Sequence, residues 1–184
     1  MRNVAHPITS VILQKMCSSP IGKCTIFVFL GALVIQFFHL IEHIAQVYQH
    51  WLLGLSIKES RGILFFLDLE WNHLIFNALY FALLMIVWKK MRRSASFGEN
   101  HVVTYTLGAG ILVQGYHVIE HIVRIAQYFK IGCTPCKGIL GWYIDGVYLH
   151  FAFNTFVLVL PLIAFCFLMF RSNEDEGKKT FISI

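Results

Sequence analysis

Four long stretches of the chain carry no charged residue, and they constrain the fold more than any other feature. They cover residues 25–41, 74–88, 102–119 and 151–170. A helix needs roughly 20 mostly apolar residues to cross a bilayer, and only helices or closed barrels satisfy their backbone hydrogen bonds in lipid. The strict alternation that is typical of strands is missing from these stretches. With 57% hydrophobic residues, the sequence predicts an all-α membrane protein.

We expect four transmembrane helices, at about 23–53, 63–88, 101–130 and 139–170. They divide the chain into two helical hairpins, 21–88 and 101–170, joined by the basic linker 89–100. Residues 1–20 form an N-terminal segment that we expect in the cytoplasm or as a short helix on the membrane surface. Residues 171–184 have mixed charge and predict a loosely ordered cytoplasmic tail.

Basic residues are distributed unevenly between the two ends of the predicted helices. Ten lysines and arginines flank the chain ends and the central linker, and four lie in or beside the two hairpin loops. The positive-inside rule therefore predicts cytoplasmic termini and hairpin loops on the other side of the membrane. This topology, together with contacts to membrane lipids, explains the net charge of +5. The charge gives no indication of nucleic-acid binding.

A polar pattern occurs twice along the chain. Residues 36–43 read Q-F-F-H-L-I-E-H, and residues 114–121, 78 positions later, read Q-G-Y-H-V-I-E-H. A second pattern, D-x4-H-x3-N, begins at residue 68 and again at residue 145, and each copy follows a G-I-L sequence. Repetition at this length indicates one structural unit used twice. We therefore predict two tandem two-helix repeats in parallel orientation, packed as one four-helix bundle with an approximate twofold axis.

The repeated residues are of types that bind metal ions. The two histidines of each first pattern stand four residues apart, so they share a helix face with the glutamate between them. Ionisable groups within a membrane cost roughly 2.5–3.5 kcal/mol each on insertion scales, and a bound ion offsets that cost. We predict a site for two ions toward the non-cytoplasmic side, with the ligands His39, Glu42, His43, His73, His117, Glu120, His121 and His150. Weak ligands, or residues that orient the ligands, are Gln36, Asp68, Asn77, Gln114, Asp145 and Asn154.

The identity of the ion is less constrained than its position. Imidazole and carboxylate ligands suit a transition metal, and we favour iron, with zinc, copper or manganese as alternatives. Haem held by one histidine on each of two facing helices is a further alternative, although it leaves the repeated glutamates unexplained. Without a cofactor, the same side chains would act only as polar contacts between helices.

Several functions are compatible with such a bundle. The leading hypothesis is a metal-dependent membrane oxidoreductase, or the metal-carrying subunit of one, acting on a lipid-soluble substrate or a quinol together with partner subunits. The alternatives are a transition-metal uptake or handling protein, a haem-binding electron carrier and a structural subunit of a membrane complex. Metal content and an optical spectrum distinguish these alternatives.

Two features lie outside the repeated patterns. Cys133 and Cys136 form a C-x-x-C sequence in the second hairpin loop. Such a pair can bind metal, cycle its redox state or close a small disulfide, and a structural disulfide is favoured in an oxidising compartment. Arg124 takes the place that Gln46 has in the first copy. It could balance Glu120, bind an anion or lie at the membrane interface.

Overall fold

The computed structural model describes residues 23–64, 70–93 and 101–182, with side chains from residue 24 to residue 170 within these ranges. It contains four long helices, α2 (Lys23–Trp51), α3 (Glu70–Met91), α5 (His101–Ile131) and α6 (Gly146–Ile182), and one 3₁₀ turn, η1 (Leu140–Trp142). No strand occurs in these ranges. The all-α prediction is therefore confirmed, whereas the predicted segment 1–20 and residues 94–100 of the linker lie outside the described residues.

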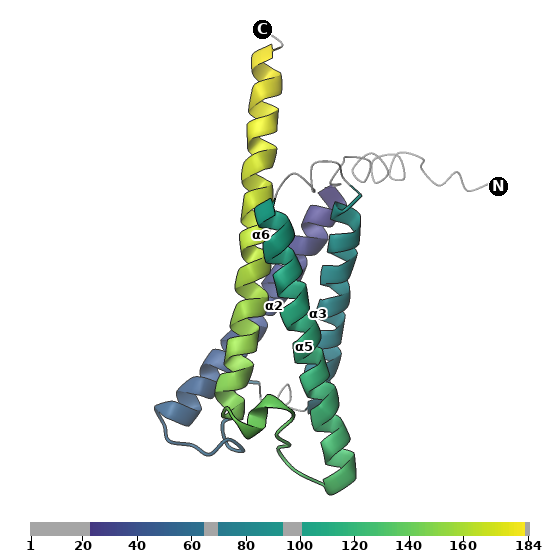
Figure 1. Ribbon diagram of the computed structural model, residues 1–184. Coiled ribbons are helices and arrows are strands. Elements are labelled where there is room, and N and C mark those ends of the chain that lie inside the picture. Colours follow the sequence, from purple (N-terminus) through teal and green to yellow (C-terminus); the bar gives the residue numbers. More distant parts are fainter. Residues whose placement is uncertain (1–22, 65–69, 94–100, 183–184) are drawn as a thin grey trace, which may run out of the picture.

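The four helices pack as a bundle in which each helix has two main neighbours. Helix α2 packs against α3 and α6, and α5 packs against the same two helices. Figure 1 shows that the connections 52–64 and 132–145 lie at the same end of the bundle, which we call the loop end. At the opposite end, the terminal end, α6 continues beyond the other helices.

The outer surface of the bundle is apolar. All four helices are long and apolar enough to cross a membrane, and many large hydrophobic side chains point outward. Examples are Phe27, Phe38, Leu112 and Phe170, each more than 60% exposed. Since a soluble protein rarely exposes so much contiguous apolar surface, the architecture is that of a multi-pass membrane protein.

The interior of the bundle has two chemically different halves. The half near the terminal end is an apolar core that includes Phe29, Leu33, Leu84, Val87, Val103 and Leu107. Tyr80 is its polar member, and its hydroxyl donates a hydrogen bond to the backbone carbonyl of Val157 at 2.9 Å. The half toward the loop end is lined by buried polar side chains, mostly histidine, glutamine, asparagine and glutamate.

The boundaries of the second and fourth predicted helices were wrong. Ile63 and Leu64 lie in a bend, and α3 is described from Glu70; residues 139–145 contain η1, and α6 begins at Gly146. At the other end of the chain, α6 continues to Ile182, where a loosely ordered tail was predicted. The segment 171–182 contains no proline that would interrupt a helix.

Candidate metal centre

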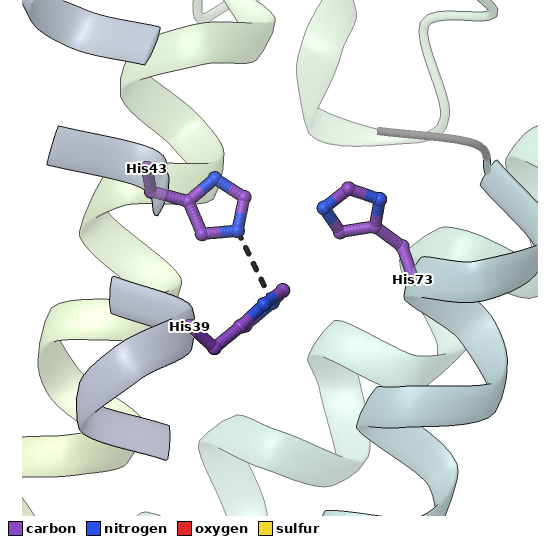
Figure 2. A group of neighbouring side chains, drawn as sticks. All are labelled: His39, His43 and His73. Carbon is purple, nitrogen blue, oxygen red and sulfur yellow. Dashed lines mark hydrogen bonds between the residues drawn. The ribbon is translucent and has the colours of Figure 1, made fainter. Parts of the chain in front are cut away.

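The first cluster of histidines lies between α2 and α3. His39 and His43 come from α2 and face His73 of α3 (Figure 2), and all three are buried. The Nε2 atoms of His39 and His43 lie 3.2 Å apart. Nδ1 of His43 lies 2.7 Å from the amide oxygen of Gln46; because that oxygen can only accept, Nδ1 carries the hydrogen and the lone pair is on Nε2. The Phe76 ring lies against the His39 ring, with 4.2 Å between centroids.

The second cluster has the same composition and lies between α5 and α6. His117 and His121 come from α5 and His150 from α6, all buried. The Nε2 atoms of His117 and His121 lie 3.1 Å apart, and the Phe153 ring stacks on His117 at 4.8 Å. Nδ1 of His121 donates a hydrogen bond to Oε1 of Glu70, on α3, at 2.7 Å. Metal-binding histidines are commonly oriented in this way, by a carboxylate that accepts a hydrogen bond from the ring nitrogen that does not bind the metal.

Each cluster could hold an ion with little rearrangement. Within each triad, one nitrogen from every histidine lies within 4.8 Å of the others. An ion bound by imidazoles sits about 2.0–2.1 Å from each nitrogen, so small side-chain rotations would bring three nitrogens into its coordination sphere. In three of the six histidines, His43, His121 and His150, Nδ1 donates to an oxygen. Their Nε2 atoms are therefore the nitrogens suited to coordination.

The two triads touch one another at the centre of the bundle. The His43 and His150 rings stack with centroids 5.8 Å apart, and the His73 and His121 rings stack at 5.6 Å. Each of these contacts joins a ring of one triad to a ring of the other. The six histidines therefore form one continuous cluster, in which two bound ions would be neighbours.

A layer of amide side chains lies next to the histidines, between them and the apolar core. Gln36 donates a hydrogen bond to the side-chain oxygen of Asn154 at 2.8 Å, and Gln114 donates to that of Asn77 at 2.9 Å. Each asparagine also donates to the backbone carbonyl four residues earlier. Asn77 Nδ2 lies 3.4 Å from Nε2 of His121 as well. These hydrogen bonds connect α2 to α6 and α5 to α3, so the amide layer joins the four helices that carry the histidines.

The two glutamates of the repeated pattern face the loops. Oε1 of Glu42 accepts a hydrogen bond from the backbone N–H of Leu64 at 2.8 Å. Oε1 of Glu120 accepts from the N–H groups of Ile139 and Leu140 at 2.8 and 3.1 Å. Neither carboxylate belongs to a histidine triad. The bonds attach the loop backbone at Leu64, Ile139 and Leu140 to a glutamate of the preceding helix, at positions where the sequence predicted the start of a helix.

Two glycines let the loops approach these glutamates. Gly62 and Gly138 have φ of +76° and +73°, and a Cβ at either position would clash with the carboxylate. Each glycine is also held by a glutamine amide. The N–H of Gly62 donates to Gln49 and its carbonyl accepts from the same side chain, and Gln127 makes the same pair of bonds with Gly138. The R/K-G-I-L sequences therefore serve to attach each loop to its helix.

The predicted aspartates have different outcomes. Oδ1 of Asp145 accepts a hydrogen bond from the N–H of Val147 at 2.9 Å, in the position of a helix N-cap. Its other oxygen lies 3.5 Å from Nε2 of His50. Asp145 therefore acts at the start of α6 and is not part of a triad. Asp68 lies outside the described residues.

Arg124 connects the second triad to α3 and to the second loop. Its Nη1 lies 2.8 Å from Nε2 of His150, and its Nε donates to the carbonyl of Cys136 at 2.9 Å. Nε also lies 3.4 Å from Oε2 of Glu70. Its carboxylate partner is thus on α3. In the same loop, Cys133 and Cys136 form a disulfide.

Protein-family models, curated proteins and solved structures give no match to this chain. The function is therefore inferred from the site.

Sequence reasoning missed several residues that support the histidines. Gln49 and Gln127 stand 78 residues apart, and Phe76 and Phe153 stand 77 apart. Extending the repeated patterns by a few residues would have found both pairs. Glu70 has no such signal, because its partner is on another helix and its counterpart 77 residues later is a valine.

Proposed function

We propose that this protein is an integral membrane metalloprotein that binds two neighbouring transition-metal ions, one in each histidine triad, and uses them as an oxidoreductase. The observation that carries the proposal is the meeting of six buried histidines from four helices at the centre of the bundle. Six such polar rings are costly inside a membrane bundle. Two ions would offset that cost and draw the facing Nε2 atoms together.

The types of ligand in the two triads favour a metal ion with a high affinity for nitrogen ligands. Oε1 of both glutamates is bonded to a loop, and the two groups of neighbouring donor atoms contain histidines alone, so we propose three imidazole ligands for each ion. Such a set suits copper first on the general affinity order, then zinc or iron, and is less suited to manganese. Three protein ligands leave coordination positions for a substrate or water, as is typical of catalytic sites.

The ring packing favours ions over haem. A haem macrocycle must lie between its two axial histidines. Here the rings that face each other across the bundle are already stacked, at 5.6 and 5.8 Å between centroids. Inserting a macrocycle would require separating the helices.

The two copies of the sequence pattern support a symmetric arrangement. We propose that the hairpins are tandem repeats related by an approximate twofold axis along the membrane normal. On this basis His73–His121 and His43–His150 are equivalent contacts. We also propose that the loop end, and the metal centre near it, lie on the non-cytoplasmic side, and the distribution of basic residues supports this orientation.

A pair of bound redox-active ions would supply two one-electron acceptors. Together they could take the two electrons of a quinol-type donor, which becomes the quinone and releases two protons, and dioxygen as the oxidant would take up the two electrons and two protons as hydrogen peroxide. The chain's own residues would hold the ions and exclude water. Among the described residues, the interior between the centre and the terminal end is an apolar core, which disfavours metal transport through the bundle.

The test is electron exchange by the full chain purified in mild detergent. We expect a short-chain quinol to reduce the bound ions and to be oxidised to the quinone in that step, and we expect the reduced ions to be reoxidised in air with uptake of oxygen. His43→Ala should abolish both signals, whereas His101→Ala, an exposed histidine at the terminal end, should leave them unchanged. Full metal occupancy without reduction by any quinol-type donor would reject the oxidoreductase and leave a metal-binding protein.

A further inference from the structure

The second loop contains a disulfide that has no equivalent in the first loop. Cys133 and Cys136 are bonded to each other, whereas the first loop, residues 52–64, contains no cysteine. Both loops are attached to their helices in the same way, because a glutamate and a glutamine of the preceding helix bind the loop backbone. The shared attachments hold the first loop without a disulfide, so the second loop has the same means of attachment without one.

A disulfide of this spacing also contributes little to stability. The two cysteines are only three residues apart, and the stabilisation that a disulfide provides grows with the length of the loop that it closes. The C-x-x-C spacing is instead the arrangement found in disulfide oxidoreductases. Together with the comparison of the two loops, the spacing favours a redox role for this pair.

The two cysteines differ in exposure. Cys133 is half-buried, and its neighbours Gly132, Thr134 and Pro135 are exposed. Cys136 is only 7% exposed. A disulfide is opened by a thiolate that attacks one sulfur and releases the other. The exposure therefore assigns Cys133 as the attacked cysteine and Cys136 as the one released.

The disulfide lies one side chain away from the second triad. Nε of Arg124 donates a hydrogen bond to the carbonyl of Cys136 at 2.9 Å. Nη1 of the same guanidinium lies 2.8 and 3.3 Å from the two ring nitrogens of His150, and so contacts the face of the ring. All three residues are buried. Because the contact is with the ring face, Nε2 of His150 stays available to an ion, and a short path through packed side chains joins that ion to the disulfide.

We propose that the Cys133–Cys136 disulfide is a second redox site, which oxidises dithiols and passes their electrons to the metal centre. A thiolate of the substrate attacks Sγ of Cys133 and releases the Cys136 thiolate. The second thiol of the substrate then displaces Cys133, so the substrate leaves as a disulfide and both cysteines are reduced. The pair closes its disulfide again by giving one electron to each of the two ions and releasing two protons. This inference rests on the proposed metal centre and adds a second class of electron donor to it.

The experiment uses an excess of reduced thioredoxin, a protein dithiol that is too large to reach the buried histidines directly. In the absence of air, the metal-stripped full chain should oxidise about one thioredoxin per chain, because only the disulfide accepts electrons. The metal-loaded chain should oxidise about two, because the two ions accept two further electrons. Alkylation of the remaining thiols measures the oxidised thioredoxin, and the optical spectrum follows the reduction of the ions.

The variant Cys133→Ser, Cys136→Ser should abolish the oxidation of thioredoxin and leave the reduction of the ions by a short-chain quinol unchanged. Cys24→Ser, at an exposed free cysteine outside the loop, should alter neither reaction. If metal-loaded wild type oxidises only about one thioredoxin per chain, or none, the inference is overturned, even if the double variant does not fold. Reduction of the ions by quinol in that sample would leave the proposed function intact, whereas wild type without bound metal would reject both.

Discussion

The two halves of the bundle interior are built on the same four helices but differ in what stabilises them. Near the terminal end, side chains such as Leu84, Val87 and Leu107 are fully buried, and they pack through complementary shape without hydrogen bonds between side chains. Toward the loop end, the interior is a hydrogen-bonded cluster that continues into the loops through Glu42 and Glu120. From this difference we expect the apolar half to maintain the helices without the metal centre, whereas the polar half has a composition that packing alone does not require.

The strongest test of this division is to empty the polar half of metal. His43→Ala combined with His121→Ala removes one ligand from each triad, and we expect metal retention to fall from about two ions per chain to almost none. Helix content by circular dichroism should persist, because the apolar half is unchanged. His101→Ala is the matched control. Loss of the fold together with the metal would show that the two halves are not separable.

The next largest effect is expected where a loop is attached to the polar half. Gly138→Ala forces a left-handed backbone on alanine and pushes its Cβ into Glu120. The free energy of unfolding in detergent should therefore fall by about 3 kcal/mol. Gly141→Ala, in the same loop, meets only an ordinary contact with Lys137 at 3.6 Å and should change stability little. Equal effects of the two variants would contradict the role given to the loop glycine.

The apolar half should respond to loss of volume alone. Leu84→Ala should lower the free energy of unfolding by about 2 kcal/mol, through lost packing contacts, and leave the number of bound ions unchanged. Leu112→Ala makes the same change at a side chain that is 76% exposed and should have almost no effect. The measurement is equilibrium unfolding in mixed micelles, with metal analysis of the folded fraction.

The smallest effect is expected at the border between the halves. Gln36→Leu removes the hydrogen bond to Asn154 and should cost about 1 kcal/mol, the typical range for one interhelical hydrogen bond in a membrane. Metal retention should be nearly normal, because neither amide is a triad member. Loss of an ion in this variant would place the amide layer among the ligands.

The sequence predicted those parts of the fold and site that depend on local spacing. The uncharged runs located four helices, and the spacing of His39 and His43 placed both rings on one face. The sequence could not predict that Glu42 faces the loop backbone, because this contact depends on the path of the chain after Gly62, which no local spacing determines. Glu70 was missed for the same reason, since no spacing rule connects it to His121.

The most direct measurement is metal analysis of the wild-type protein purified in mild detergent, combined with X-ray absorption at the edge of the metal that is found. The account predicts about two transition-metal ions per chain, each with a shell of imidazole nitrogens, and none in the His43→Ala, His121→Ala variant. A folded protein without metal, or one with the Soret band of haem, would contradict it.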